Sequence, residues 1–486
     1  MHYRNLYYDS TINYGNSNNN KKIELLCAID FGSTRTAAGW TIGVDNIPRN
    51  QFITTDGIKI KLDPNDDNFT TPTAILFKKI DQNDWEPISF GKSAEREYFG
   101  LRNNEIDNYR FFKNYKMKLY QNNSINPKIR SFSGEEWSII KVLSGVFKFI
   151  NQKFIESVNE SNSKINLSIN NDTTQWVLTV PAIWEDKAKE IMRRAFFQAG
   201  LISSQDSANL LFCYEPEAAA LVFIQDQRNN LDKLKNKNLL VVDAGRRTID
   251  ITLVKPTIVN NEIEKFEILM VPTGGDSGSI YIDQEFIKFF QSFLNLNNNQ
   301  FNQFKNECPK GFLKLSNQWE GIKIKIFIGD LTEYDSHFLE IPRIILRYLE
   351  KRFGIKDFKG LAKKFNQRNQ NSGLSEIEWD DDERFLVISG DRIKSFFKKA
   401  IQKLRSDLNL FKQTTEILRQ TDIVLFTGGL SNSDYFRKSV QKILGNNYQY
   451  CKSSYPEKSN LVGSIYFGFD PKIISIKRSQ FTMRKN

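Results

Sequence analysis

Two aspartates end apolar segments that are each followed by a glycine-containing turn. Asp30 closes LLCAID before Gly32, and Asp243 closes LLVVD before Gly245. Glycine in such a turn lets an anion approach the exposed backbone N–H groups, while the carboxylate repels a phosphate and must act through a cation. A single unit of this kind is weak evidence, because Asp-Gly turns are ordinary hairpin connections. Two in corresponding places predict a site for phosphate together with a divalent cation.

Each aspartate belongs to a predicted strand–turn–strand unit. Apolar runs return after both turns, as GWTIGV in the first unit and TIDITLV in the second, and each predicts a strand paired with the one before it. Because the same features recur in both halves of the chain, we expect a duplicated α/β lobe with a phosphate-facing hairpin in each copy. The long spacing between the copies excludes a short-period repeat.

Further elements are predicted around the two units. WVLTVP is a strand ending at Pro181, followed by a helix from about Glu185 that Gly200 closes. LLFCYEP is another strand, and Pro216 suits the first position of the next helix. Later helices are predicted at 283–294, 319–326 and 390–408.

Two further segments complete the pattern. DIVLFTGG predicts a strand and a Gly-Gly turn, before a helix that Ser431 or Ser433 caps. The Asn-rich stretch 295–302 is predicted to be a surface loop.

Composition limits the classes of protein. The 486 residues are 40% hydrophobic and 26% charged, which suits a folded chain of two or three domain-sized units or one two-lobed fold. No run reaches the roughly 18 apolar residues of a spanning helix, and the N-terminus lacks the apolar core of a secretion signal. Four cysteines without paired spacing favour a reducing compartment, so we expect a cytoplasmic protein with no membrane partner.

The charge balance raises the question of a nucleic-acid partner. The net charge is +11, with basic patches at 351–368 and 472–486, but acidic residues are interspersed almost everywhere else. Solvated faces explain scattered charge better, so nucleic acid is not the predicted partner. Two histidines leave little room for zinc or for His-based catalysis.

The order of motifs resembles the actin-like ATPase superfamily, and within it the nucleotide-binding domain of the 70-kDa heat-shock proteins. IDFGSTRT and VVDAGRRTID resemble the two phosphate loops, and FTGGLSN resembles the adenosine motif. Five further segments resemble the atypical heat-shock 70 kDa protein 12 branch: FGKSAEREY, FKNYKMKLY, FCYEPEAAAL, MVPTGGDSGSIYIDQEF and LVGSIYFGFDP. The resemblance covers about residues 23–471.

This resemblance implies an α/β, two-lobed actin-like ATPase fold, with duplicated ribonuclease H-like mixed sheets flanked by helices and a nucleotide cleft between the lobes. We expect lobe I at 23–231 with a returning segment at 454–471, and lobe II at 238–450. Residues 1–22 are predicted to be a disordered Asn-rich arm, and 472–486 a basic tail. The chain stops about where the family's peptide-binding domain begins, so it is expected either to be a fragment or to lack client binding.

The resemblance also implies ATP or ADP with Mg²⁺ as ligands. Asp30 and Asp243 would hold Mg²⁺ through water. The residues implied to contact the nucleotide are Gly32, Ser33 and Thr34 at the β-phosphate, Gly245, Arg246, Arg247 and Thr248 at the γ-phosphate loop, Gly274 and Gly275 at the phosphate–ribose side, Glu320 and Lys323 at the ribose and adenine, and Gly428 and Gly429 at the nucleoside.

Three residues are implied to act in catalysis. Glu215 would position the attacking water, Asp250 would be its second acidic neighbour, and Lys116, with Lys113 as the alternative, would lie near the γ-phosphate. Structural interpretations stay open for two of them: Glu215 also favours a helix N-terminus through the dipole, and Asp250 lies on an alternating strand where it could point to water.

The same holds for Glu320 and Lys323, which a solvated helix face would explain as well. No comparable interpretation explains an aspartate at the end of an apolar strand in both halves.

One departure from the family pattern leaves the activity open. The second loop has Arg246 and Arg247 where glycines are usual, and a positive φ there would strain each by about 1–2 kcal/mol. Pointing into the cleft, a guanidinium either binds the γ-phosphate as an arginine finger does or takes its place. The chain is therefore expected to be an ATP-binding domain with slow hydrolysis that drives lobe closure, or a non-catalytic nucleotide-dependent interaction module.

Three further expectations concern class and partners. A small-molecule kinase of the same superfamily would need a base aspartate in a sugar pocket, for which no convincing motif is present. A filament-forming relative stays open. Protein partners or co-chaperones are expected on the resemblance alone.

Overall fold

The computed structural model describes most of the chain. The described residues are 23–42, 58–102, 104–121, 126–161, 169–182, 184–260, 262–270, 273–275, 277–328, 332, 335–414, 420–454 and 456–476. The predicted disordered arm lies outside these residues, as does most of the predicted basic tail.

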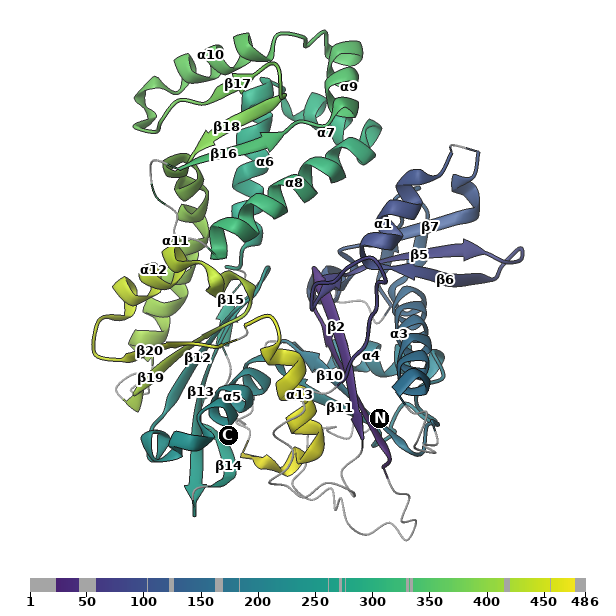
Figure 1. Ribbon diagram of the computed structural model, residues 1–486, viewed down its shortest axis with the longest axis vertical. Coiled ribbons are helices and arrows are strands. Elements are labelled where there is room, and N and C mark those ends of the chain that lie inside the picture. Colours follow the sequence, from purple (N-terminus) through teal and green to yellow (C-terminus); the bar gives the residue numbers. More distant parts are fainter. Residues whose placement is uncertain are drawn as a thin grey trace, which may run out of the picture.

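Two mixed sheets with the same strand order form the centre of the molecule (Figure 1). The first has the order β3-β2-β1-β10-β11, with β4 beside β2, and the second has the order β14-β13-β12-β19-β20, with β21 beside β14 and β15 beside β13. The strands of the first sheet are β1 (Leu25–Phe31), β2 (Arg35–Ile42), β3 (Ile58–Lys59), β4 (Thr71–Pro72), β10 (Thr174–Val180) and β11 (Leu210–Tyr214). Those of the second are β12 (Leu239–Ala244), β13 (Ile249–Val259), β14 (Glu262–Ile268), β15 (Thr273–Gly275), β19 (Ile423–Thr427), β20 (Gln449–Lys452) and β21 (Ile474–Ile476).

The two sheets also share strand directions and register. In both, the two strands of the hairpin are antiparallel: β1 with β2, and β12 with β13. The strands on the other side of β1 and β12 pair in parallel, in the orders β1-β10-β11 and β12-β19-β20. Asp30 lies opposite Ala37 on β2, and Asp243 lies opposite Asp250 on β13. This repeated topology confirms the predicted duplication of a mixed sheet flanked by helices, which is the two-lobed architecture expected from the sequence.

Two helices pack between the sheets and join the lobes. Helix α5 (Glu215–Asp226) and helix α13 (Ser459–Phe469) share one apolar core with the inner faces of both sheets. They approach so closely that a Cβ on Gly463 would lie 1.9 Å from the carbonyl oxygen of Ala218. Helix α13, from the predicted returning segment, also contacts β1 and β10, which places it on lobe I.

The outer faces of the sheets are covered by separate helices. Helices α3 (Ile139–Ser161) and α4 (Asp186–Gln198) cover the first sheet. Helices α6 (Ile280–Leu294), α11 (Gly390–Thr414) and α12 (Asp434–Leu444) cover the second. Tryptophan and phenylalanine fill both cores, so each lobe has a large apolar interior of its own.

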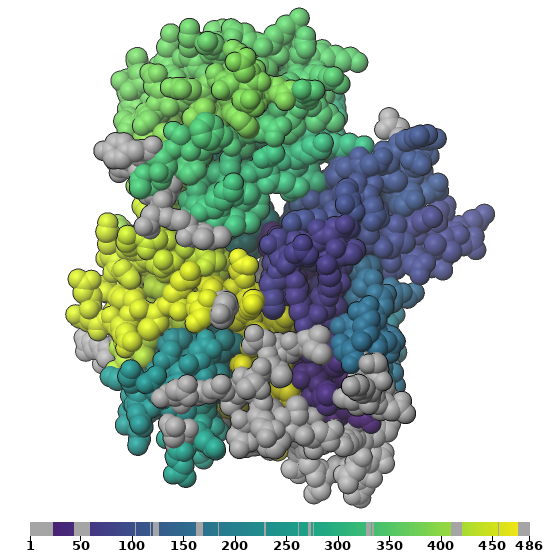
Figure 2. All heavy atoms as spheres, viewed as in Figure 1, coloured from purple at the N-terminus to yellow at the C-terminus, as the bar shows by residue number. Residues whose placement is uncertain are grey.

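A smaller unit extends from each lobe on the same side of the molecule. In lobe I it contains β5 (Ala74–Lys79), β6 (Trp85–Phe90), β7 (Tyr109–Lys113), β8 (Lys128–Arg130), β9 (Glu136–Ser138), α1 (Gly91–Gly100) and α2 (Lys118–Gln121). In lobe II it contains β16 (Ser336–Glu340), β17 (Glu378–Asp380), β18 (Phe385–Ser389), α7 (Asn298–Glu307), α8 (Pro309–Ile328), α9 (Arg343–Phe353) and α10 (Phe358–Arg368). Figure 2 shows a notch between these units, the green surface of lobe II and the blue surface of lobe I.

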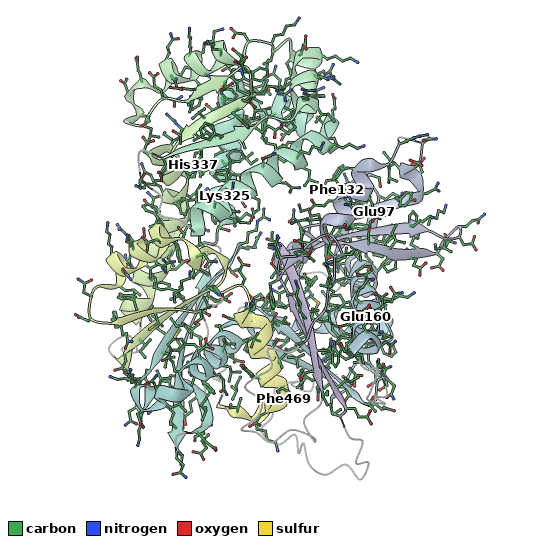
Figure 3. The ribbon with its side chains drawn as sticks, in the orientation of Figure 1. Glu97, Phe132, Glu160, Lys325, His337 and Phe469 are labelled. Carbon is green, nitrogen blue, oxygen red and sulfur yellow. The ribbon has the colours of Figure 1, made fainter. Side chains whose placement is uncertain are left out.

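Side chains on α8 and α1 meet at this notch. Asn317 Nδ2 donates to Glu95 Oε2 at 3.0 Å, and Lys310 Nζ donates to the Leu101 carbonyl oxygen at 3.4 Å. In Figure 3, Lys325 of α8 lies on the lobe II side of the notch, while Glu97 and Phe132 lie on the lobe I side. The lobes are therefore connected at the outer units as well as at α5 and α13.

Several sequence predictions need correction. The stretch 295–302 is not all loop, because Asn297 caps α7. The Asn297 side chain accepts a hydrogen bond from the Gln300 backbone N–H, and the Gln300 side chain accepts one from the Asn297 backbone N–H. Helix α5 begins at Glu215, one residue before Pro216. Of the two caps that the sequence left open, Ser431 and Ser433, it is Ser433 that caps α12.

The predicted tail is also partly ordered, because β21 pairs with β14. None of the described helices combines the length and the apolar composition needed to cross a membrane.

Candidate functional site

The first hairpin turn is braced by a residue forty positions away in the chain. The hydroxyl of Thr73 donates to the Gly32 carbonyl oxygen at 2.8 Å, and its backbone N–H donates to the Thr34 carbonyl oxygen at 2.7 Å. A Cβ on Gly32 would lie 2.2 Å from the Arg35 carbonyl oxygen, so this turn requires glycine. Ser33 lies in the same turn and is partly exposed. The loop is thus held in one shape before any ligand arrives.

The second hairpin turn is braced by backbone hydrogen bonds from the start of α6. The carbonyl oxygens of Gly245, Arg246 and Arg247 accept hydrogen bonds from backbone N–H groups of residues 278–280, at the start of α6. The Gly245 N–H donates to the Thr248 carbonyl oxygen at 2.9 Å and closes the turn. Neither arginine has a positive φ, so the backbone strain considered from the sequence does not arise.

Four carboxylates come together where the two hairpins face each other. They are Asp30, Asp243, Asp250 and Glu215, and we call them the carboxylate centre. Burial raises the pKa of Asp243 well above its ordinary value, and the charges of the other three raise it further. A hydrogen bond from Asn460 of α13 acts in the opposite direction.

Burial and neighbouring negative charge also raise the pKa values of Asp30 and Asp250. Burial and then the charge of Glu215 raise the pKa of Asp30 to about 6, against the hydrogen bond from Thr179 and the charge of Lys116. Burial and Glu215 raise the pKa of Asp250 to about 7, against Thr248 and Lys116. The surroundings therefore do not fully compensate the charge of the ionised carboxylates, and Asp30, Asp243 and Asp250 take up protons at higher pH than isolated carboxylates do.

Lys116 is the cation of this centre. Its ammonium group is 1% exposed, donates to the Phe31 carbonyl oxygen and lies 3.4 Å from Glu215 Oε1. The ring of Trp184 lies 4.8 Å from it. Lys113, the alternative from the sequence, instead pairs with Glu95 at 2.7 Å on the outer unit.

Asp250 does not point to water. It is 1% exposed, accepts from the Thr248 hydroxyl at 3.0 Å through Oδ2, and its Oδ1 has no hydrogen-bond partner among the described residues. A buried carboxylate oxygen without a donor is costly, and it marks a place where a ligand or its water would be stabilising.

Glycines line the centre where side chains would collide with it. A Cβ on Gly428 would lie 2.4 Å from Asp243 Oδ1, and one on Gly274 would lie 2.9 Å from Asp250 Oδ1. Gly275 adjoins Asp407 of α11, and Gly429 faces open space. The first two glycines therefore keep room beside the carboxylates.

A second group of charges lies next to the centre, and we call it the ion-pair chain. Arg246 Nη2 lies 3.1 Å from Asp283 Oδ2, Lys323 Nζ donates to Asp283 Oδ1 at 2.8 Å, and Lys323 lies 2.6 Å from Glu320. Arg246 Nη1 also donates to the Thr34 hydroxyl at 3.2 Å, which links the second turn to the first. Lys323 is buried and not part of a solvated face.

The structure thus brings part of the predicted site residues together in two groups: Asp30, Asp243, Asp250, Glu215 and Lys116 in the carboxylate centre, and Arg246, Glu320 and Lys323 in the ion-pair chain. The set could hold a hard cation: its donors are oxygens, and one of them is unpartnered. Among the described residues no three His, Cys, Asp or Glu side chains are grouped to ligate a metal directly. Mg²⁺ keeps several of its waters and needs no such group, so the donor set fits it.

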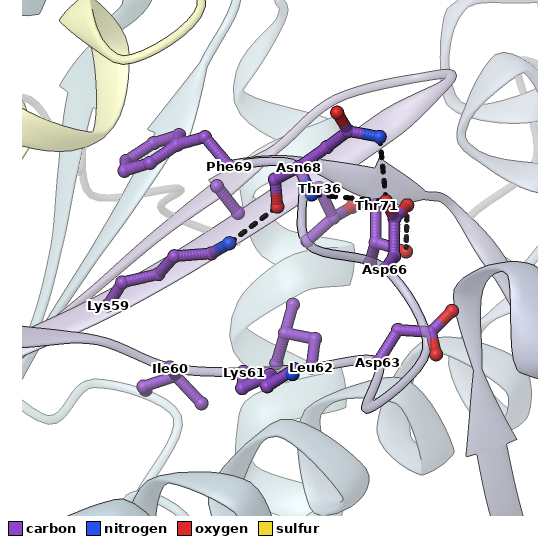
Figure 4. Close-up of a pocket in the computed structure, with 11 residues that line it drawn as sticks. Thr36, Lys59, Ile60, Lys61, Leu62, Asp63, Asp66, Asn68, Phe69 and Thr71 are labelled. Carbon is purple, nitrogen blue, oxygen red and sulfur yellow. Dashed lines mark hydrogen bonds between the residues drawn. The ribbon is translucent and has the colours of Figure 1, made fainter.

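A separate hollow contains none of the predicted site residues. It is formed by β2 and the segment 59–71 (Figure 4). Its polar groups bond to each other: Lys59 Nζ donates to the Asn68 carbonyl oxygen, and the Asn68 N–H donates to Asp66 Oδ1 at 3.2 Å. Two residues after this segment the chain reaches Thr73, which holds the first turn.

Comparison with known proteins decides the family. No protein-family model matches the chain. It is 23% identical to human heat shock 70 kDa protein 12A over 94% of this chain and 71% of that protein. It is 21% identical to human heat shock 70 kDa protein 12B over 94% of this chain and 70% of that protein. The chaperone protein DnaK of Metamycoplasma hominis is 24% identical over 87% of this chain and 60% of that protein.

The chain is a distant relative of the 70-kDa heat-shock proteins. Its similarity to proteins 12A and 12B extends over nearly the whole chain, which agrees with the resemblance to their branch that the sequence motifs predicted. Homology to the 70-kDa heat-shock proteins implies a nucleotide-binding domain, and the two mixed sheets flanked by helices agree with the fold of such a domain.

Sequence reasoning missed four residues of this heat-shock-type site. They are Thr73, Thr179, Asp283 and Asn460. Thr179 ends a predicted strand beside Asp30, so its position was readable from the pattern. Nothing local distinguishes the other three from surface residues, because each acts through contacts with distant parts of the chain.

Proposed function

We propose that this chain binds ATP and ADP with Mg²⁺ between its two hairpins, as a nucleotide-binding domain of the 70-kDa heat-shock type. The observation that supports this best is the carboxylate centre. Four buried or half-buried acids lie around one lysine, and a bound cation would stabilise the ionised forms of Asp30, Asp243 and Asp250, whose pKa values are raised without one. These acids adjoin two braced turns with room beside them.

The chain's own residues would divide the work. The N–H groups of Gly32 and Ser33 and the Thr34 hydroxyl would bind the β-phosphate, and Asp30 and Asp243 would hold the waters of Mg²⁺. When bound, Mg²⁺ supplies positive charge between the carboxylates and the phosphates. Closure of the lobes around the nucleotide would exclude water from the cleft.

Hydrolysis is the finer part of the proposal. Glu215 would orient a water, and Lys116, 3.4 Å from Glu215, would stabilise charge on the transferred phosphoryl group. The alternative, a non-catalytic nucleotide-dependent interaction module, is supported by Arg246, which lies across the two turns where the family has glycine. Protein partners and a cytoplasmic location belong to the same proposal and rest on the homology and the sparse cysteines.

Thermal unfolding of the chain with ATP, ADP or no nucleotide, each with Mg²⁺ or a chelator, tests binding. A ligand at about 100 times its dissociation constant stabilises the native state by about 2.7 kcal/mol, so both nucleotides should raise Tm when Mg²⁺ is present. No shift with either nucleotide would contradict the proposal. Single-turnover hydrolysis of ATP then separates the ATPase from the binding module.

A further inference from the structure

Arg246 lies between the two phosphate-facing turns and is fixed at both ends of its guanidinium group. Nη1 donates to the Thr34 hydroxyl of the first turn, and Nη2 pairs with Asp283. Its Nε has no hydrogen-bond partner among the described residues. The guanidinium thus has donor capacity left for an anion that also reaches Thr34.

Asp283 holds this arginine in a rigid frame. It is the fourth residue of α6, and the first N–H of the same helix, that of Ile280, donates to the Arg246 carbonyl oxygen at 2.6 Å. The backbone that carries Arg246 and the carboxylate that orients its side chain are therefore fixed to one another.

Asp283 orients a second cation at the same time. Its Oδ1 accepts from Lys323 Nζ at 2.8 Å and from Trp319 Nε1 at 2.9 Å, both on α8. Although burial would raise the pKa of Asp283, the charges of Lys323 and Arg246 hold it below the ordinary value, so the carboxylate stays ionised between them. One carboxylate thus sets the positions of a cation on the second turn and a cation on α8.

Arg246 and Lys116 act on different acids. The lysine charge that shifts the pKa of Asp30 and Asp250 is that of Lys116, whereas Arg246 acts on Asp283. Arg246 thus belongs to the ion-pair chain, beside Thr34, and Lys116 belongs to the carboxylate centre.

We propose that Asp283 is a positioning residue that aligns Arg246 and Lys323 for the diphosphate and ribose of a nucleotide, with Arg246 contacting the β-phosphate that ADP and ATP share. This rests on the proposed function. It assigns Arg246 neither the role of a finger for the γ-phosphate nor that of an obstacle to it. The ligand class that follows is the nucleoside diphosphate part common to both nucleotides, and AMP lacks the group that Arg246 binds.

Titration calorimetry of the full chain with Mg²⁺ and AMP, ADP or ATP tests this, with the apo Tm of each variant as the folding control. Arg246→Ala should weaken ADP and ATP by the same factor, about tenfold or more, and AMP by less than about twofold. Arg347→Ala, which removes the same charge from an exposed position on α9, is the control and should change each Kd by less than about threefold.

The role of Asp283 has its own readout. Asp283→Asn should weaken ADP and ATP by about tenfold or more, and Asp283→Glu should recover part of the loss. The double variant with Arg246→Ala should lose less than the sum of the two single losses, because the part of the Asp283 effect that acts through Arg246 is already gone. Should Arg246→Ala unfold, Arg246→Lys, which keeps the charge and loses the fork, should show the same equal loss for ADP and ATP.

The outcomes separate the inference from the function on which it rests. If the wild-type chain binds none of the three nucleotides, both the proposed function and the inference are wrong. Wild-type binding with a loss confined to ATP in Arg246→Ala would make Arg246 a γ-phosphate ligand and overturn the inference, and a gain in affinity for ATP would make it an obstacle. A loss of AMP affinity in Arg246→Ala equal to the loss for ADP and ATP would also overturn the inference. Fully additive losses in the double variant of Arg246→Ala and Asp283→Asn would do the same.

Discussion

The hairpins β1–β2 and β12–β13 start from the same plan and differ in what surrounds their aspartates. In lobe I, Thr179 of the neighbouring parallel strand donates to Asp30 at 2.8 Å, and the residue opposite Asp30 is Ala37. In lobe II, the corresponding Thr427 has no hydrogen-bond partner for its hydroxyl among the described residues, and the residue opposite Asp243 is a second acid, Asp250.

The difference shows how a duplicated fold can become an asymmetric site. Strand order and register repeat, so each aspartate lies near the end of the first strand of its own sheet, and the two interact in the carboxylate centre. Lobe I then supplies a hydroxyl donor and Lys116, whereas lobe II supplies further negative charge and the arginines of its turn. We infer that the need for an added cation is concentrated on the lobe II side.

The largest expected effect concerns Gly428, in the turn after β19. The corresponding residue of lobe I is Val180, at the end of β10. Gly428 has φ 80° and ψ 161°, a conformation essentially restricted to glycine, and its Cβ would collide with Asp243. Gly428→Ala should destabilise the chain by about 4 kcal/mol in urea unfolding. Gly429→Ala, in open space, is the control and should change stability by less than about 0.5 kcal/mol; similar losses in both would contradict the explanation.

The next effect separates the two aspartates. Asp243→Asn should weaken Mg²⁺-dependent ADP binding by about 100-fold, equivalent to about 2.7 kcal/mol, because Asp243 lies among three other acids that also need the cation. Asp30→Asn should weaken the same ADP binding by about tenfold, because Thr179 and Lys116 already compensate part of the charge of Asp30. Calorimetry with and without Mg²⁺ measures both, and equal losses would mean that the lobes share the cation evenly.

A third effect concerns the extra acid of lobe II and depends on pH. The folded chain raises the pKa of Asp250 from 3.8 to about 7, so ionisation costs stability increasingly between these pH values and fully above about 7. Asp250→Asn should therefore stabilise the nucleotide-free chain by about 2 kcal/mol or more at pH 8, and by little at pH 4.5.

The reverse substitution in lobe I is the control for that effect. Ala37→Asp should lower stability at pH 8 more than at pH 4.5, because it places an acid opposite Asp30. Urea unfolding at the two pH values measures both variants. A gain in Asp250→Asn that does not depend on pH would point to packing and not to charge.

The smallest effect compares the two threonines. Thr179→Val removes the donor to Asp30 and should cost about 1 kcal/mol, with a higher pKa for Asp30. Thr427→Val should be neutral or slightly stabilising, because its hydroxyl is buried without a partner among the described residues. Thermal unfolding of the two variants side by side checks this, and a larger loss at Thr427 would reverse the comparison.

Local patterns predicted the parts of the site that depend on neighbouring residues. An apolar run ending in Asp and followed by glycine predicted both hairpins, and the pattern before Pro216 predicted α5 to within one residue. The Asn-rich stretch before α7 was misread, because asparagine favours loops and helix caps alike and only the reciprocal bond with Gln300 decides between them. The small sheets β5–β7 and β16–β18 were not predicted; each combines a local hairpin with one strand pair of long sequence separation, β5 with β7 and β16 with β18.

The sequence by itself determined the duplicated hairpins, the two aspartates that end their first strands, the glycines of the turns and the branch of the heat-shock family. Each of these is set by residue type and spacing within a few positions. Only the tertiary structure decided that Thr73 braces the first turn, that α6 braces the second, and that Asp283 joins Arg246 to Lys323. The physical reason is that a charge or donor acts on whatever folding places within a few ångströms, and those partners lie about 30 to 40 residues apart in the chain.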